Sequence, residues 1–288
     1  MRKVFGKQFH RLVVVGSTVA LLATGAVSSA SSVSATTMHS GTVEVLSCGS
    51  FSNVMTLLEA AFKKDTGYTI QDTSEGSSAI ASGIVAKTLQ GDVFISASPA
   101  ADAAIEGSAN GDWTNSYTLF GRSPDVLAYN PKSSFAAAMK KGVWYKVIQR
   151  SSFELGRTDP TVDPGGVLDV DALDGLGYAY NIPGLRAIAA STGNVYSEDA
   201  IPGLIQAGQL DAGFMYAISA KAADLPYVPL TGTKNLNAVY TIASLNGAPD
   251  PKPAAAFVKW FLGKQGQAIL LKQGIVAASP FEVVRASK

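Results

Sequence analysis

Short apolar runs alternate with stretches of helical spacing along the first part of the chain. Residues 42–46 form one apolar run, and the apolar positions from Val54 to Phe62 then recur at helical spacing until Gly67 ends the pattern. Such alternation is typical of α/β units with a mostly parallel sheet. The predicted strands are 42–46, 68–70 and 92–96, and the predicted helices are 54–66, a helix that starts just after residues 76–78, and 99–105.

The alternation returns after residue 122. Strands are predicted over 125–130, 211–216 and 238–244, and helices over 133–141, 201–207, 254–262 and 265–273. Two such units without a flexible linker predict two lobes joined by strand crossovers, with a cleft between them. The first lobe is predicted to contain residues 41–122 and 236–288, and the second residues 123–235.

The N-terminal 35 residues have the pattern of a secretory signal peptide. Four basic residues precede an apolar stretch from Leu12 to Val27, and small residues follow up to Ala35. A membrane anchor is the alternative, although the apolar stretch is short and interrupted by glycine for a spanning helix. We therefore expect residues 1–35 to be removed and the remainder to be secreted, to the periplasm or the cell exterior.

Charge and composition then narrow the class of protein. Four of the 23 basic residues and none of the 22 acidic ones precede residue 36, so the remainder carries a net charge of −3. This balance argues against nucleic acid as a partner. Cys48 is the only cysteine, which excludes an intrachain disulfide. Both histidines, His10 and His39, lie outside the predicted lobes, so histidine-dependent triads and histidine metal sites are not expected there.

Two serine-containing loops, "SCGSFSN" at 47–53 and "EGSSA" at 75–79, each lead from a predicted strand into a predicted helix. Unpaired backbone N–H groups and the positive end of the helix dipole meet at such junctions, and Ser50 and Ser77 add hydroxyl donors. Ordinary capping of their own helices is the alternative role for both serines. Together the loops predict a small, uncharged cup of hydrogen-bond donors that would suit an anion.

The stretch "GRTDPTVDPGG" at 156–166 is predicted as a long, rigid, turn-rich loop. It leaves the backbone N–H of Gly165 able to face a ligand. Asp159 and Asp163 are either turn-forming residues, acceptors for a protonated oxyanion, or ligands of a metal centre, and Arg157 can pair with either.

Tyr216 ends the predicted strand "DAGFMY", again at the cleft edge. Its hydroxyl can donate to a ligand there, but a half-buried structural tyrosine is equally common.

The order of these motifs resembles the molybdate/tungstate-binding proteins of ABC importers. The resemblance runs from "CGSFSN" and "EGSS" through "GDVFISAS" and "GRTDPTVDPGG" to "LIQAGQLDAGFMY". It implies an α/β, two-lobed periplasmic-binding-protein (Venus flytrap) fold, with a mostly parallel sheet in each lobe and the ligand in the cleft. The residues that it places in the site are Ser50, Ser77 and Tyr216 through hydroxyls, and Gly165 and Glu198 through the backbone.

The tungstate-type branch of this family also brings carboxylates to the metal of the anion, and there the chain departs from the pattern. Asp163 corresponds to one carboxylate, so it is the metal ligand if the metal is coordinated directly. Met215 stands where the other would be. The missing carboxylate predicts a tetrahedral, four-coordinate anion. Asp163 then points away from the cup, ligates the metal, or accepts a proton from the ligand, and the sequence leaves these three open.

These observations predict a secreted solute-binding protein that captures molybdate or tungstate for an ABC importer. Both are dianions near pH 7, so a cup of neutral donors suits them, whereas the proton of HPO₄²⁻ would be left unpaired at a cost of about 1–3 kcal/mol. We expect a monomer that is not an enzyme, has no cofactor and meets the importer permease at the membrane. The alternatives are another oxyanion such as phosphate or sulfate, a sensor or adhesin of the same fold, and a hydrolase that uses Asp159 and Asp163.

Overall fold

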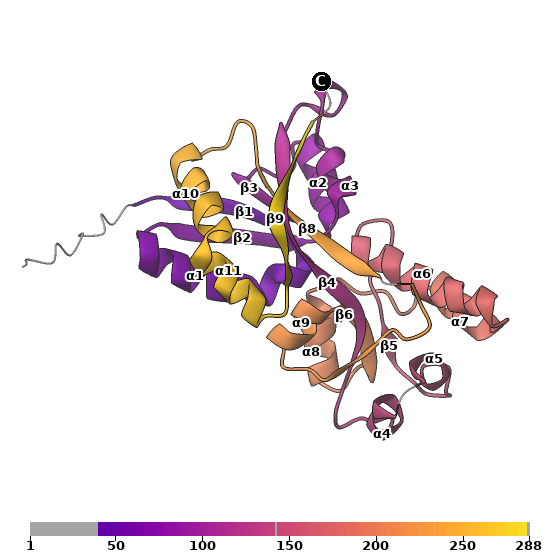
Figure 1. Cartoon of the computed structure of the whole chain (residues 1–288). Coiled ribbons are helices and arrows are strands. Elements are labelled where there is room, and N and C mark those ends of the chain that lie inside the picture. Colours follow the sequence, from indigo (N-terminus) through magenta and orange to yellow (C-terminus); the bar gives the residue numbers. More distant parts are fainter. Residues whose placement is uncertain (1–39, 142, 235, 287–288) are drawn as a thin grey trace, which may run out of the picture. The chain divides into compact units, whose positions relative to one another are not determined.

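The computed structural model describes residues 40–286, except residues 142 and 235 (Figure 1). The predicted signal peptide, 1–35, lies outside the described residues. Within the described range, no helix has the length and apolar character needed to cross a membrane.

The first lobe is built around β1, with β2 and β3 pairing parallel on its two sides. Its first helix ends as the sequence predicts, because Gly67 adopts a left-handed conformation (φ 86°) and its N–H donates to the Lys63 carbonyl. The elements in chain order are β1 (Thr42–Cys48), η1 (Gly49–Phe51), α1 (Ser52–Thr66), β2 (Thr69–Glu75), α2 (Ser77–Val85), β3 (Val93–Ser96), α3 (Pro99–Ala103) and η2 (Ser108–Asn110).

The second lobe contains a smaller set of strands and most of the short helices. Its elements are α4 (Ala136–Lys140), α5 (Trp144–Val147), β5 (Leu155–Gly156), α6 (Pro164–Ala179), α7 (Pro183–Ala190), α8 (Ala200–Gln206), β6 (Ala212–Tyr216), α9 (Ala217–Ala222) and β7 (Tyr227–Pro229). The chain then returns to the first lobe through β8 (Asn237–Ser244), α10 (Pro251–Leu262), α11 (Lys264–Lys272) and β9 (Val276–Arg285).

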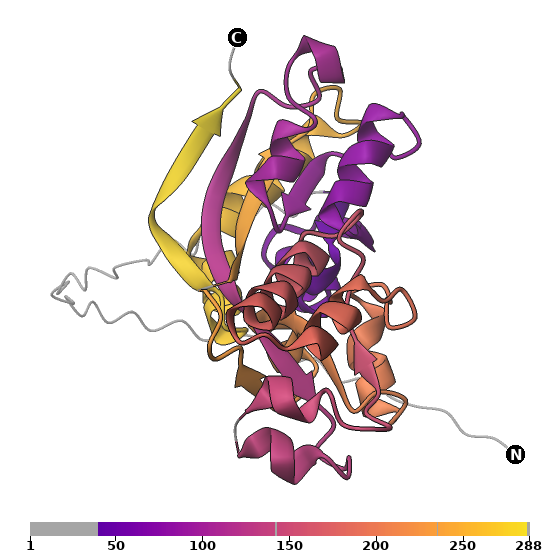
Figure 2. The same cartoon turned by 90° about the vertical axis from the view of Figure 1, so that its right-hand side faces the viewer.

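One long strand, β4 (Ser116–Tyr129), runs through both lobes. Up to Pro124 it pairs with β8, and from Asp125 it pairs with β6 instead. The described strands follow the order β2-β1-β3-β8-β4-β6-β5, and β7 and β9 also pair with β4. Figure 2 shows β9 alongside β4. The change of partner lies close to the boundary predicted between residues 122 and 123, and the exact lobe boundaries stay a prediction.

The sheet is mixed, which corrects the expectation of mostly parallel sheets. The parallel pairs are β1–β2, β1–β3 and β5–β6, whereas every pairing of β4 and β8 is antiparallel. The reason is the crossover itself: β4 leaves the first lobe and β8 returns to it, so the two strands run in opposite directions. The predicted α/β, two-lobed class is confirmed.

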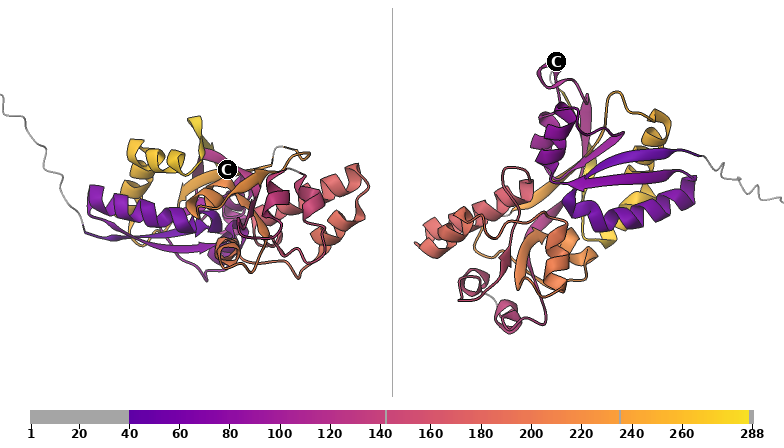
Figure 3. Two further views of the ribbon diagram at one scale, coloured as in Figure 1. Left: turned by 90° about the horizontal axis from the view of Figure 1, so that it is seen from below. Right: turned by 180° about the vertical axis from the view of Figure 1, so that it is seen from behind.

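Helices cover both faces of the strands in each lobe (Figure 3). In the second lobe, Leu127 and Phe214 pack in the cluster that includes α6 and α7, while their neighbours Val126 and Met215 pack with α8 and α9. Side chains alternate between the two faces of a strand, so strands covered on both faces are apolar throughout. This arrangement leaves the loops at the strand ends free to form a site.

Candidate functional site

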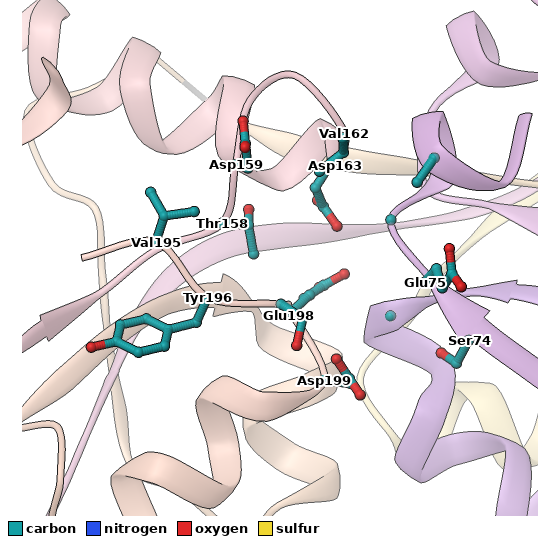
Figure 4. Close-up of a pocket in the computed structure, with 14 residues that line it drawn as sticks. Ser74, Glu75, Thr158, Asp159, Val162, Asp163, Val195, Tyr196, Glu198 and Asp199 are labelled. Carbon is teal, nitrogen blue, oxygen red and sulfur yellow. The ribbon is translucent and has the colours of Figure 1, made fainter. Parts of the chain in front are cut away.

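A cavity of about 420 Å³ lies where loops of the two lobes meet (Figure 4). The first lobe contributes residues from the β1–η1 and β2–α2 junctions, and the second contributes the segments before α6 and before α8. The lining residues are Gly49, Ser74, Glu75, Gly76, Ala79, Thr158, Asp159, Val162, Asp163, Val195, Tyr196, Ser197, Glu198 and Asp199.

Ser50 lies in η1 next to Gly49, and of these two residues only Gly49 lines the cavity. Its hydroxyl accepts a hydrogen bond from the Tyr240 hydroxyl at 3.1 Å and lies 3.4 Å from the Cys48 sulfur. The side chain caps no helix, so the capping role considered for Ser50 is wrong.

Ser77 is the first residue of α2 and is fully buried. Its hydroxyl accepts a hydrogen bond from the Ala97 N–H at 3.0 Å, which leaves its own proton for another partner. The N-cap of α2 is Gly76, and no side chain caps it, so the capping role is wrong for Ser77 as well. Further into the first turn of α2, the Ala79 N–H donates 3.1 Å across the cavity to the Val162 carbonyl.

Asp163 lines the cavity rather than pointing away from it. Its Oδ1 accepts from the Gly165 N–H at 2.7 Å and so caps α6, whose first helical residue is Pro164. Helix α6 therefore begins inside the stretch predicted as a loop, because the sequence Asp-Pro supplies both its cap and its first residue. Burial raises the pKa of Asp163 to about 6 against the opposing effect of the Gly165 and Gly166 N–H groups.

Two buried hydroxyl groups near Gly165 have no hydrogen-bond partner in the described part of the chain. They are the hydroxyls of Tyr216, at the end of β6, and of Thr158, which are 1% and 2% exposed. A Cβ placed on Gly165 would lie 3.4 Å from the Tyr216 oxygen, 3.3 Å from the Thr158 oxygen and 2.9 Å from Asp163 Oδ1. A buried hydroxyl without a partner costs about 1–3 kcal/mol, so both groups have hydrogen-bonding capacity that the described residues leave unused.

Glu198 brings a second carboxyl group to the cavity, on the segment before α8. A Cβ on Gly49 would lie 3.1 Å from its Oε2, and the Ser50 N–H lies close enough to lower its pKa by hydrogen bonding. Burial and the nearby Asp163 outweigh that effect, and the pKa of Glu198 is raised well above its usual value. Oε1 has no partner among the described residues. The sequence predicted that the backbone of Glu198 would contact the ligand. In the structure, the side chain of Glu198 lies against Gly49 of the first lobe.

The site is consequently more acidic than the predicted cup of neutral donors. Asp163 and Glu198 line the cavity, and no lysine or arginine is among its lining residues in the described range. Arg157 is buried beside it and donates to the carbonyl oxygens of Thr158, Ala189 and Ser191 instead of pairing with an aspartate. Carboxyl groups that share a low-dielectric space hold their protons more tightly, because each charge opposes the next.

The other aspartate of the loop has the turn-forming role considered in the sequence. Asp159 Oδ1 accepts from the backbone N–H and the hydroxyl of Thr161, and these bonds lower the pKa of Asp159. Met215 packs in the apolar cluster with α8 and α9, whereas Tyr216 belongs to the cluster that includes α1 and α10.

Sequence reasoning missed three polar residues of this region: Thr158, Asp125 and Asp169. Asp125 and Asp169 are both buried, and Asp169 accepts the Thr158 N–H at 3.2 Å. In the sequence, Asp125 stands out only as an acidic residue at the start of an apolar strand, and Asp169 only as an acidic residue within an apolar helical pattern. Across the described residues, no set of three Asp, Glu, Cys or His side chains is arranged to hold a metal ion.

A crossing strand shared by two α/β lobes, with a polar cavity between their loops, defines a two-lobed solute-binding protein. The chain belongs to the bacterial extracellular solute-binding protein family, whose pattern matches residues 43–276.

Relatives and solved structures agree with this assignment. The molybdate/tungstate-binding protein WtpA of Pyrococcus abyssi is 25% identical over 55% of this chain, and that of Thermococcus kodakarensis is 23% identical over 56%. The chain spans about three fifths of the length of these relatives, 61% and 60% respectively. The periplasmic molybdate-binding protein of Azotobacter vinelandii superimposes with a TM-score of 0.64 at 17% identity, covering 81% of this chain and 98% of its own, which shows the shared fold.

Proposed function

We propose that the chain captures a tetrahedral oxyanion, molybdate or tungstate, and delivers it to the permease of an ABC importer. The observation that carries this proposal is that the buried hydroxyls of Tyr216 and Thr158, both near Gly165, have no partner among the described residues. Relatives named for molybdate and tungstate support the choice of ligand.

The ligand would lie among neutral donors. Thr158 lines the cavity, and the buried hydroxyls of Ser50, Ser77 and Tyr216 and the backbone N–H of Gly165 would complete the set of donors in this proposal. Neutral donors and helix N-termini hold a dianion without the desolvation of a lysine or arginine. Asp163 and Glu198 would then be neutral acids in the complex, since a dianion beside an ionised carboxylate is strongly repelled.

We infer that the protein binds its ligand without transforming it, and that it acts as a secreted monomer without a cofactor. Asp159 is engaged in a turn and Asp163 in a helix cap, which leaves the hydrolase alternative without a free pair of carboxylates. This one proposal comprises the ligand, the permease partner and a site formed by Ser50, Ser77, Asp163, Gly165, Glu198 and Tyr216.

A second candidate ligand is a protonated oxyanion such as HPO₄²⁻. The observation in its favour is the presence of Asp163 and Glu198 at the cavity, since an ionised carboxylate accepts the proton that a cup of donors leaves unpaired.

Isothermal titration of the protein from Thr36 onward with molybdate, tungstate, sulfate and phosphate at pH 7 tests both candidates. Tight binding of molybdate and tungstate, with sulfate and phosphate at least about tenfold weaker, supports the first. A preference for phosphate supports the second. Binding of none of the four would contradict capture of an oxyanion and favour the sensor or adhesin alternative.

A further inference from the structure

A basic surface covers the end of the second lobe that is formed by α4 and α5 (Figure 1). The 23 residues from 131 to 153 contain five basic and no acidic residues, although residues 36–288 together carry a net charge of −3. The five basic residues are Lys132, Lys140, Lys141, Lys146 and Arg150. The rest of residues 36–288 therefore has a net charge of −8, so the positive charge of this end contrasts with an acidic remainder.

The fold holds the five cations at the surface. Met139, Trp144 and Val147 bury the apolar sides of α4 and α5 in the core of the second lobe. Trp144 Nε1 also donates to the Thr231 carbonyl at 3.1 Å. All five basic residues are exposed, and among the described residues no hydrogen bond or ion pair engages their charged groups. Their charge is therefore available to a partner.

One acidic residue of the second lobe fixes both ends of this basic segment. The Asp211 carboxylate accepts from the Ser133 hydroxyl at one end and from the Glu154 N–H, at 2.8 Å, at the other. Asp211 is thus engaged in holding the segment. The exposed Glu154 lines a different hollow, beside Phe153 and Leu155.

Three of the cations surround a surface hollow of about 460 Å³ to which both helices contribute. They are Lys141, Lys146 and Arg150, and the rest of the hollow is lined by alanine and valine side chains such as Val143, which is 41% exposed. No acidic residue is among its described lining residues. Positive charge around small apolar side chains suits a group that is negatively charged at one end and apolar at the other.

We propose that this basic surface binds a membrane that contains anionic phospholipids, with a lipid phosphate in the hollow between α4 and α5. Clusters of about four to eight lysines and arginines bind such membranes, and each cation near the surface contributes about fivefold to binding. Four of the five cations are lysines, which are depleted in protein–protein interfaces, so the composition favours a lipid surface over a protein partner. The acidic remainder would be repelled by the same membrane, which orients the protein with α4 and α5 toward it.

This inference goes beyond the proposed function and does not depend on which ligand the cavity holds. Attachment through α4 and α5 would keep the protein beside a membrane of the kind in which the proposed permease lies.

Co-sedimentation with lipid vesicles tests the proposal. The protein from Thr36 onward is used, so that the four basic residues of the first 35 do not contribute. At about 0.05 M salt it should bind vesicles with about one third phosphatidylglycerol at least about tenfold more tightly than vesicles of phosphatidylcholine alone. Binding should be lost at about 0.5 M salt, because salt screens exposed charges. No molybdate is present, so failure of the proposed function would leave this result unaffected.

The triple variant Lys141→Gln/Lys146→Gln/Arg150→Gln assigns the binding to the hollow. It removes three charges but keeps side chains that are long and polar. Its affinity for the phosphatidylglycerol vesicles should be at least about tenfold lower than that of the wild type.

The matched control is Lys63→Gln/Lys64→Gln/Lys272→Gln, which removes the same charge from exposed positions on α1 and α11. It should bind within about threefold of the wild type, and melting temperatures close to that of the wild type should show that both variants fold. Equal losses in the two triple variants would overturn the assignment to α4 and α5, because net charge alone would then explain binding. If the wild type binds neither kind of vesicle, the lipid partner is overturned, and an acidic protein surface becomes the partner that fits the charge.

Discussion

The Ala79 backbone N–H donates a hydrogen bond of 3.1 Å to the Val162 carbonyl, and this bond links the first turn of α2 to the segment before α6. It belongs to a contact in which loops of the two lobes touch across the cavity. Gly76, the N-cap of α2, lies beneath the same carbonyl. The two lobes approach this closely only because residue 76 has no side chain.

Gly76→Ala should therefore weaken ligand binding. The added Cβ would overlap the Val162 carbonyl oxygen and lie 3.0 Å from Asp163 Oδ2, so the loops must separate. We expect molybdate affinity to fall at least about tenfold, measured by isothermal titration. Gly175→Ala in α6 is the matched control, because its Cβ would meet no atom within 4 Å. Equal affinities for the two variants would show that the loop contact is not needed for binding.

Tyr216→Phe and Thr158→Val should lower the affinity for the anion without lowering the stability of the protein. Each removes a buried hydroxyl that has no partner among the described residues, so the ligand-free protein should become more stable or stay unchanged. Affinity for the anion should fall by about 1 kcal/mol, or about fivefold, for each variant. Titration and thermal denaturation of the same samples measure the two effects.

The control for this pair is Tyr178→Phe, since the Tyr178 side chain is 70% exposed and does not line the cavity. Tyr178→Phe should change neither the anion affinity nor the melting temperature measurably. A destabilised Tyr216→Phe that binds as the wild type does would assign Tyr216 a structural role.

Glu198→Gln should strengthen anion binding, and increasingly so as the pH rises. Burial and Asp163 raise the pKa of Glu198, so its negative charge appears at a higher pH than that of an ordinary glutamate and then repels the ligand. The ratio of variant to wild-type affinity should grow between pH 5 and pH 9. Glu75→Gln is the control, because Glu75 lines the same cavity but is exposed and its charge is screened by solvent. A ratio that stays constant with pH would remove Glu198 from the electrostatics of the site.

The sequence pattern predicted the elements that are apolar on a regular period. The elements that occur close to their predicted positions are β1, α1, β3, β6 and β8. Their buried faces produce the regular spacing of apolar residues from which they were predicted. The first half of β4 and all of β9 were missed. Both are partly exposed strands with mixed polarity, and β4 holds its shape through pairing with strands distant in sequence.

The candidate site was predictable in its residue types but not in its charge. The strand–helix junctions near Ser50 and Ser77 and the strand end at Tyr216 follow from local pattern, and Ser50 and Tyr216 both contact Tyr240 in the structure. That Glu198 approaches Gly49 depends on the contact between the lobes, which leaves no local trace in the sequence.

Asp102→Asn should remove a pH dependence of stability that has no connection to the ligand. Asp102 is fully buried under β8, accepts a hydrogen bond from the Thr241 hydroxyl through Oδ2, and leaves Oδ1 without a partner among the described residues. Burial raises its pKa to about 8. Because this folded-state value lies above the ordinary one of about 3.9, the stabilising effect of the protonated acid is complete below about pH 4 and is lost as the pH rises toward 8. The melting temperature of the wild type should thus fall relative to that of Asp102→Asn between pH 5 and pH 8. The exposed Asp171→Asn should follow the wild type, and a pH profile of Asp102→Asn that also follows it would show that Asp102 is ionised in the folded protein.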